Sequence, residues 1–424
     1  MMLDKNNVGK KTHNNSSVMD FNVVWLAALI QLVSALDFMM IMPLGPDLSR
    51  ALNISPTYIG YLGGGYALAA ALSSLLCARY LDRFDRKHVA LITLLGISLS
   101  TWACALAWNM ESLFFTRLLA GVFAGPATSI ALAIVVDATP VEQRGRAMAI
   151  VMGAFSLSAI AGVPLGLELA MLKGWSAPFY VLGGLGLCVC VAVYTRLPGM
   201  TAHLGLNQKA FSSIEMLKRP VVLNAFMAIG LAIFSTFLIV PNIAAYFQFN
   251  LDVPRGDMSH YYVMGGIFSL FSMQLGGLFI DRFGAMKVTI LMGALTIAVV
   301  WDGFLHEPWL PTIVIFTLFM VVTSTRTLTV AAVNSQVAAP WERAGFMSLQ
   351  NVFQHIFSGS AAVVSSMILT NVDGHLGNIT LLAWLTIVLT IIQPLFLYRL
   401  LKLLRLGTPN RMFDQRDLWG NRLD

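Results

Sequence analysis

The sequence predicts an all-α integral membrane protein with twelve transmembrane helices in two pseudo-symmetric bundles of six. Three observations predict this fold class. Hydrophobic residues make up 57% of the 424 residues and charged residues only 11%, less than half of the roughly 25% that is usual in soluble domains. The apolar residues form runs long enough to cross a bilayer. The second half of the chain also repeats short motifs of the first half.

The same composition argues against several classes of protein. The 27 basic and 21 acidic residues are too few to cover the surface of a soluble enzyme, a nucleic-acid binder or a disordered scaffold of this length. Residues 1–19 are polar and lack the apolar core of a secretory signal peptide, so they are expected to stay in the cytoplasm. The four cysteines lie in apolar segments without metal-site spacing. We therefore expect no metal and no cofactor.

Twelve apolar runs are expected to span the bilayer, because a helix needs about 20 such residues to cross roughly 30 Å of hydrocarbon. An even number of spans places both termini on the same side of the membrane. The runs cover approximately residues 21–44, 57–80, 88–108, 112–137, 146–170, 177–196, 221–247, 259–280, 286–305, 310–336, 345–370 and 378–401.

The loop charges predict the orientation. Among the 27 Lys and Arg residues, only Arg50, Lys173 and Arg255 lie in loops that follow odd-numbered spans, and Arg117 and Arg326 lie within spans. The remaining basic residues lie in the termini and in the other loops. Because basic loops stay on the cytoplasmic side, we expect a multi-pass protein of the plasma (cytoplasmic) membrane with both termini inside.

The chain is expected to divide into five parts. A cytoplasmic segment, 1–19, precedes a six-helix bundle, 20–196. A cytoplasmic linker of mixed polarity, 197–220, leads to a second six-helix bundle, 221–403. The tail, 404–424, is basic and is expected to lie on the inner membrane surface, with binding of a partner protein as the alternative.

An internal repeat relates the two bundles. The segment 78–87, between spans 2 and 3, corresponds to 277–287, between spans 8 and 9, and both contain Asp-Arg-Phe. Pro140, Glu142 and Gly145 likewise correspond to a proline, a glutamate and a glycine two hundred positions later. Two parallel repeats of six spans are typical of one transporter architecture.

At these positions the sequence resembles the major facilitator superfamily, over residues 20–403. The superfamily's motif between spans 2 and 3 reads G-x-L-a-D-R-x-G-R-K. The copy in the second half keeps its Gly, Asp, Arg, Gly and Lys, including Asp281 and Arg282. The copy in the first half lacks both glycines but keeps Asp82, Arg83, Arg86 and Lys87.

Further segments resemble the twelve-span drug/proton antiporter-like branch. Arg117 and Gly121 fit the R-x-x-q-G motif of span 4, with alanine at the usual glutamine. The stretch 162–166 resembles the antiporter motif of span 5, G-P-x-x-G-G, although its proline and glycine are two apart rather than three. The resemblance implies a conformational switch formed by Asp82, Arg83, Arg86, Asp137, Arg144, Asp281, Arg282, Gly162, Pro164 and Gly166.

Within this switch, the resemblance implies that Asp82 lies at the inner end of span 2, beside the inner end of span 11. There it would favour the outward-open state, while Arg83 and Arg86 tie the loop to Asp137. The glycines of spans 2 and 5 permit close packing of helices.

Ionisable residues inside the membrane are costly and are functional candidates by default. Asp37 in span 1 and Arg117 in span 4 are expected at similar depths, and Gln31 and Ser34 extend the polar stripe of Asp37. A carboxyl group that alternates between a proton and an arginine is a plausible coupling device. The alternative is a permanent structural ion pair between spans 1 and 4.

A second polar group is expected in the C-terminal half. Arg326 lies within span 10, and span 11 places several polar residues on one face by helical spacing. Gln274 of span 8 is expected to face them. The expected substrate-binding residues are Gln31, Ser34, Arg326, Asn351, Gln354, His355 and Gln274.

These patterns predict a secondary active transporter that exports a small organic solute in exchange for protons. A proton-coupled importer of a nutrient or metal chelate is the alternative, followed by a transporter-like receptor. Sequence motifs of hydrolases and nucleotide-binding enzymes are absent, so an enzyme is not expected. The expected partners are a small-molecule substrate, protons and membrane lipid, without nucleic acid, and the protein is expected to be a monomer. Two buried arginines, Arg117 and Arg326, against one buried carboxylate, Asp37, favour a neutral or anionic substrate.

Overall fold

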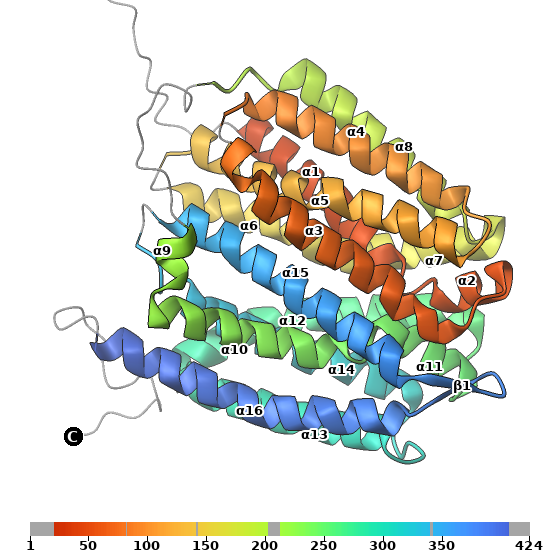
Figure 1. Ribbon diagram of the computed structural model, residues 1–424. Helices are drawn as coiled ribbons and strands as arrows, with labels where there is room; N and C mark the ends of the chain where they lie inside the picture. Colours follow the sequence, from red (N-terminus) through yellow and green to blue (C-terminus); the bar gives the residue numbers. More distant parts are fainter. Residues whose placement is uncertain (1–20, 82, 141–142, 202–212, 340–341, 407–424) are drawn as a thin grey trace, which may run out of the picture.

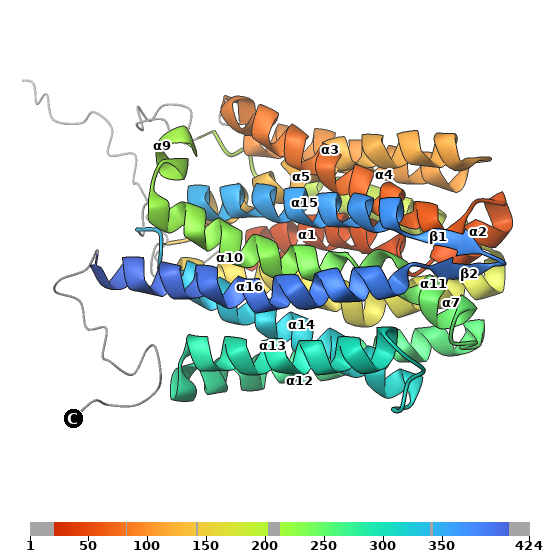
Figure 2. The ribbon, with the colours of Figure 1, turned by 60° about the horizontal axis from the view of Figure 1, so that its bottom comes forward.

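The structure is a computed structural model that describes residues 21–81, 83–140, 143–201, 213–339 and 342–406. Long helices run side by side between two ends (Figures 1 and 2). We call one end the α9 end, after the short helix α9, and the other the α2 end, after the short helix α2. The loop charges predict that the α9 end is cytoplasmic and the α2 end external.

The first half of the chain supplies the helices that surround Asp37. They are α1 (Phe21–Met40), α2 (Gly45–Leu52), a 3₁₀ turn η1 (Pro56–Tyr58), α3 (Ile59–Leu81), α4 (Arg86–Ala105), α5 (Met110–Ala138), α6 (Arg144–Leu157), a π-helical segment η3 (Ser158–Gly162), α7 (Val163–Lys173) and α8 (Ala177–Arg196).

The second half follows the same plan and adds a small hairpin. Its elements are α9 (Ser213–Leu217), α10 (Pro220–Phe237), η5 (Val240–Asn242), α11 (Ile243–Phe249), η6 (Arg255–Asp257), α12 (Met258–Phe283), α13 (Ala285–Phe304), α14 (Thr312–Asn334), α15 (Arg343–Ile368), β1 (Thr370–Val372), β2 (His375–Gly377) and α16 (Ile379–Leu406). The two strands pair antiparallel at the α2 end.

The predicted all-α membrane architecture is confirmed. All twelve predicted runs are helical, and in the described part of the chain eleven helical segments are long and apolar enough to cross a membrane. The twelfth run is α15, a 26-residue helix whose polar residues lower its hydropathy. It lies along α3 (Figure 1).

Two predicted spans differ from simple helices. The first ends at Met40, and residues 45–52 form the separate helix α2. The fifth contains the π-helical segment η3 directly before Pro164. Proline has no N–H to donate, so the hydrogen-bond ladder must adjust in the preceding turn.

Local hydrogen bonds determine where individual helices begin. Asn109 and Ser112 form a capping box at the start of α5. Asp85 caps α4 by accepting from the N–H of Lys87, and it also accepts from the N–H of Met200 at 2.9 Å. Burial by itself raises the pKa of Asp85, but the two backbone hydrogen bonds together with the attraction of His88 and Lys87 lower the pKa overall.

The helices pack mostly with partners from their own half. In the first half α3, α4 and α1 pack on α5, and α8 packs on α4; in the second half α12 and α13 pack on α14, and α10 packs on α16. Between the halves, α3 packs along α15 and α7 packs on α12. This pattern agrees with two bundles, but the proposed bounds of the five parts stay a prediction. Most of the linker and the tail beyond Leu406 lie outside the described residues.

An ion pair at the α9 end gives a testable pH dependence. Arg219 donates to both carboxylate oxygens of Glu342, at 2.7 and 2.8 Å. The hydrogen bond from Arg219 lowers the pKa of Glu342, so the pair's contribution is present above the ordinary glutamate pKa of about 4.3 and is lost as the pH falls through the lowered value. Glu342→Gln should therefore lower the unfolding temperature at neutral pH, by the equivalent of about 0.2–1 kcal/mol.

The measurement is thermal unfolding of purified protein at neutral pH and in strong acid, where the variant and the wild type should become equal. Glu307→Gln removes an exposed carboxylate at the other end of the molecule and is the matched control. A difference that persists in strong acid would contradict the prediction.

Candidate transport site

A fully buried ion pair joins α1 and α5. Arg117 Nη1 donates to Asp37 Oδ1 at 3.1 Å, and Arg117 Nη2 donates to the backbone carbonyl of Asp37 at 2.8 Å. Both side chains are 0% exposed. Asp37 lies in the last turn of α1, where the helix dipole favours a positive charge. The structure thus brings together the two residues that the sequence predicts as a pair, and their part in proton coupling stays a prediction.

Two residues that sequence reasoning missed complete this site. Thr101 of α4 donates to Asp37 Oδ1 at 2.8 Å. The Tyr66 ring of α3 lies under the Arg117 guanidinium, 4.3 Å from its carbon to the ring centroid, as in a cation–π contact. Threonine and tyrosine are common in apolar helices, so no signal in the sequence distinguishes these two from other buried residues.

One carboxylate oxygen of Asp37 has no hydrogen-bond partner among the described residues. This oxygen, Oδ2, is buried. Such an oxygen is where a proton would bind if the carboxyl group became neutral, since the other oxygen is held by Thr101 and Arg117. Uptake of a proton at this oxygen during transport stays a prediction.

The polar stripe on α1 is only partly shared with this site. The Ser34 hydroxyl donates to the Ile30 carbonyl of its own helix at 3.1 Å, and the Ser34 carbonyl accepts from the Tyr66 hydroxyl at 3.4 Å. Gln31 is buried, and its Oε1 has no partner in the described part of the chain. Their role in substrate binding stays a prediction.

Arg326 occupies the corresponding place in the second half but has uncharged partners. It is 0% exposed. Its Nη1 donates to Thr390 at 2.7 Å, and its Nη2 donates to Ser235 at 2.6 Å and to the Ala232 carbonyl at 3.0 Å. These partners from α10 and α16 enclose Arg326 in this conformation, and its part in substrate binding stays a prediction. The preference for a neutral or anionic substrate likewise stays a prediction.

The other residues expected beside Arg326 lie elsewhere. The His355 ring meets the edge of Phe38 across the boundary between the halves. Asn351 and Gln354 of α15 are half-buried, and Gln274 of α12 is exposed. The described hydrogen bonds of Arg326 involve neither His355 nor Gln274, and the role of these residues in substrate binding stays a prediction. Helical spacing predicted which polar residues share one face of α15, but it could not predict which helix packs against that face.

The loop residues expected to form the conformational switch differ in their contacts and in their exposure. At the α9 end Arg86 Nε donates to Asp137 at 3.1 Å, and Arg144 donates to the Thr139 carbonyl at 3.2 Å. Arg83, Asp281 and Arg282 are exposed, and Asp82 lies outside the described residues. The role of all these residues in switching stays a prediction.

The span 5 motif packs against α1. A β-carbon on Gly162 would lie 1.9 Å from Leu36, and one on Gly166 would lie 2.3 Å from Met40. The two glycines therefore permit close approach to the last turns of α1, beside Asp37. Pro164 is buried between them. Small residues at a helix contact are typical of membrane proteins.

Residues 27–362 match the sequence profile of the Major Facilitator Superfamily. The chain belongs to the major facilitator superfamily. It is therefore a multi-pass membrane transporter that carries small molecules, and it is not an enzyme. The predicted resemblance and fold are confirmed.

Similar proteins include efflux transporters. Multidrug resistance protein 1 of Bacillus subtilis is 25% identical over 343 residues, covering 77% of this chain and 86% of that protein. Multidrug resistance protein 2 of the same organism is 30% identical over 217 residues, covering 48% of this chain and only 54% of that protein. A probable sugar efflux transporter of Helicobacter pylori is 24% identical over 251 residues, covering 58% and 63%.

Solved structures support the same fold. A D-xylose–proton symporter superposes with a TM-score of 0.73 at 14% identity, covering 90% of this chain and 98% of the other. A bacterial homologue of the human lysosomal transporter Spinster, inward-facing and occupied, gives 0.72 at 15% identity, covering 90% and 96%. At these identities the likeness concerns the fold alone.

The transporter is closed at the α2 end by polar contacts between its halves. Arg255 of η6 forms an ion pair with Asp47 of α2, with 2.7 Å between Nη2 and Oδ2, and Arg255 also donates to the Leu167 carbonyl at 3.0 Å. Beside it, Ser259 of α12 donates to Glu168 of α7. Sequence reasoning used Arg255 only as a loop charge and did not consider Asp47.

Close backbone packing seals the same end of the transporter. A β-carbon on Gly60 of α3 would lie 2.3 Å from the Ala362 carbonyl of α15, and one on Gly64 would lie 2.8 Å from the Gly359 carbonyl. Glycine is needed here because any side chain would meet backbone atoms of the other half. The α2 end therefore closes through contact of α3 with α15 as well as through ion pairs.

Removing the Asp47–Arg255 pair should favour opening of the α2 end. Arg255→Ala deletes a partly buried pair that exists only while the halves touch, and a change of about 1 kcal/mol corresponds to about a five-fold shift in population. The measurement is reaction of a cysteine introduced at Ser366, which is buried at the contact of α15 with Gly60, with a water-soluble maleimide. Lys173→Ala, an exposed basic residue at the same end, is the control.

A charge exchange sharpens this test. The double variant Asp47→Arg with Arg255→Asp restores opposite charges and should return reactivity toward that of the parent protein. Equal reactivity in the single variant, the double variant and the parent would show that the pair does not hold the halves together.

Proposed function

We propose that this transporter exports a small organic solute in exchange for protons, with the Asp37–Arg117 pair as the proton-coupling site. The observation that carries the proposal is the complete burial of this pair in the membrane. A buried ion pair is weak evidence for stability, because the cost of removing both charges from water can exceed their attraction. A titratable pair kept at such a cost suggests a functional role.

The geometry supports a carboxyl group that exchanges a proton for an arginine. With Asp37 ionised, Arg117 neutralises it and holds both its side chain and its backbone carbonyl. With Asp37 protonated, the electrostatic attraction between the two side chains weakens. Arg117 then keeps its hydrogen bond to the Asp37 carbonyl and its contact with the Tyr66 ring. The two protonation states therefore place different forces on the last turn of α1. This difference is what a proton needs in order to bias one conformation over another.

Alternating access supports the direction of the proposal. The α2 end is closed by the contacts between α3 and α15 and between Asp47 and Arg255. We propose that this end faces the outside and that the α9 end faces the cytoplasm, so the conformation described is closed to the outside.

Efflux is favoured over uptake by the similarity to a multidrug resistance protein and to a probable sugar efflux transporter. Uptake of a nutrient or metal chelate is kept open by the span 5 motif, where Pro164 and Gly166 depart from the antiporter spacing. Arg117 is paired with Asp37, and Arg326 is enclosed by uncharged partners, so a test of substrates has to include all charge classes.

The experiment uses the full chain in two steps. First, thermal unfolding is measured with ethidium, lactose and salicylate, which represent lipophilic cations, neutral sugars and organic anions. Second, any compound that raises the unfolding temperature is tested in proteoliposomes that contain a pH-sensitive dye. Solute-dependent proton movement opposite to the solute would support exchange. Movement of both in the same direction would indicate uptake, and solute movement without protons would overturn the coupling.

A further inference from the structure

In each half a buried arginine binds the end of the first helix, but only in the first half does this contact include a titratable group. Arg117 binds the last turn of α1 through Asp37. Arg326 binds the last turns of α10 through Ser235 and the Ala232 carbonyl. A change of protonation at Asp37 can therefore alter the interaction of Arg117 with α1. The interaction of Arg326 with α10 stays unchanged, because its partners are uncharged.

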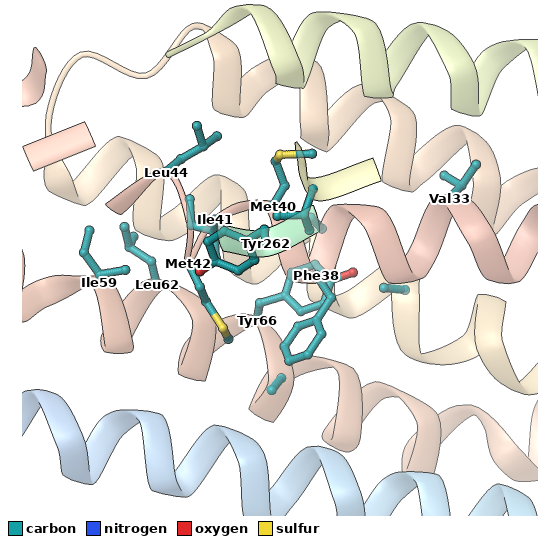
Figure 3. Close-up of a cluster of buried hydrophobic side chains, with 14 of the residues drawn as sticks. Val33, Phe38, Met40, Ile41, Met42, Leu44, Ile59, Leu62, Tyr66 and Tyr262 are labelled. Carbon is teal, nitrogen blue, oxygen red and sulfur yellow. The ribbon is translucent and has the colours of Figure 1, made fainter. Parts of the chain in front are cut away.

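A stack of aromatic rings connects these two helix ends directly. Phe38, the residue after Asp37, stacks on Phe237, the last residue of α10, with 6.0 Å between ring centroids and 22° between planes. The same Phe38 ring lies 5.6 Å from Tyr66, which carries Arg117, and meets the edge of His355 at 6.1 Å. Figure 3 shows Phe38 beside Tyr66 at the end of α1. The Phe38 ring thus contacts Tyr66, which stacks on Arg117, and two side chains of the second half, Phe237 and His355.

We propose that Phe38 is the positioning residue that transmits the protonation state of Asp37 to the C-terminal half, through its stack on Phe237. The inference rests on the proposed function, because it needs Asp37 to gain and lose a proton. Phe38 holds no proton and is not proposed to bind the solute. It acts through the position of the last turn of α1, which it shares with Asp37.

The geometry favours transmission at this point over the other contacts between the halves. The Asp47–Arg255 pair and the α3–α15 glycines lie at the α2 end on other helices. Phe38 is 7% exposed, so a shift of the α1 backbone cannot be absorbed by solvent and has to move its neighbours. An aromatic pair in contact is worth enough to bias a two-state equilibrium several-fold.

Other titratable or charged groups near this stack have to be separated from Asp37. Arg117 faces it from α5, Tyr66 from α3, Cys104 from α4 and His355 from α15. If the pH response came from His355 or from any group other than Asp37, it would survive the change Asp37→Asn. This variant therefore belongs in the experiment.

The experiment measures how pH changes the opening of the α2 end. Spin labels are placed at Tyr58 and Val372, which are exposed on opposite halves at that end, in a full-length background with the four native cysteines replaced by serine. Pulsed electron resonance gives the ratio of open to closed molecules in lipid nanodiscs at mildly acidic and mildly alkaline pH. The quantity compared is the change of this ratio with pH.

The parent protein should change its ratio with pH, and Asp37→Asn should not. In Phe38→Ala the change should shrink by about 2- to 10-fold, the range expected for loss of an aromatic contact. Phe237→Ala removes the same contact from the other side and should behave alike, which keeps the test valid if Phe38→Ala fails to fold. The matched control is Phe234→Ala on the same helix, whose described ring contact is with Phe357 of its own half and which should keep the full response.

The outcomes separate the inference from the proposed function. A parent protein without any pH response, or a response that survives in Asp37→Asn, would overturn both. A response that is lost in Asp37→Asn but complete in Phe38→Ala and Phe237→Ala would leave proton coupling in place and remove Phe38 from it. A response lost equally in Phe234→Ala would also overturn the inference, since packing anywhere on α10 would then suffice.

Discussion

Asp37→Asn is expected to abolish proton-driven transport and to leave binding of the solute measurable. The amide keeps the shape of the side chain and can still accept a hydrogen bond from Thr101, but it cannot take up and release a proton. Transport driven by a pH gradient in proteoliposomes should therefore fall to the rate of liposomes without protein. Binding is measured by the thermal shift with the compound selected above.

A second buried carboxylate provides the matched control. Asp302 of α13 is 8% exposed, and its oxygens accept from the backbone N–H groups of Trp309 and Leu310, which is a structural role in a loop. Asp302→Asn should keep proton-driven transport, and Asp37→Glu should restore part of it. Proton-driven transport at the parent rate in Asp37→Asn would remove Asp37 from the mechanism.

Gly60→Leu is expected to prevent closure of the α2 end and so to stop the transport cycle. A side chain at this position would overlap the Ala362 carbonyl and the Ser366 hydroxyl of α15, and overpacking of this kind costs about 1–3 kcal/mol or more. Even the smaller change Gly60→Ala should shift the population toward the open state by about 5- to 150-fold. The spin-label distance between Tyr58 and Val372 checks this directly.

The control for the glycine contact is Gly184→Ala on α8, where an added β-carbon would meet nothing within 4 Å. It should leave both the distance distribution and the transport rate unchanged. A closed α2 end in Gly60→Leu would show that α3 and α15 can separate locally while the halves stay together, and the close backbone packing would then not control access.

Much of the fold follows from the sequence, because a membrane leaves few choices. Backbone groups in hydrocarbon have to be satisfied within a helix, so twelve apolar runs become twelve helices with ends within a few residues of those predicted. The departures have local causes. Pro164 forces the π-helical segment of span 5, and α2 separates from span 1 after Met40.

The candidate site was predictable only where depth in the membrane determines contact. Asp37 and Arg117 meet because two helices with charges at the same depth gain from pairing them. Arg326 has no carboxylate at its depth, and the sequence offered Gln354 and His355 as neighbours. The structure instead surrounds it with Ser235 and Thr390.

The sequence by itself therefore determined the class of fold, the spans, the family and the pair of buried charges. Each of these depends on a single helix, its length, its hydropathy and the depth of its polar residues. Only the tertiary structure decided that Phe38 stacks on Phe237, that Arg255 meets Asp47 and that α10 and α16 enclose Arg326. These contacts depend on how each helix is rotated about its axis and which neighbours it packs against. A rotation by the angle between two successive residues brings a different side chain into contact without changing the hydropathy of the helix or the depth of its residues.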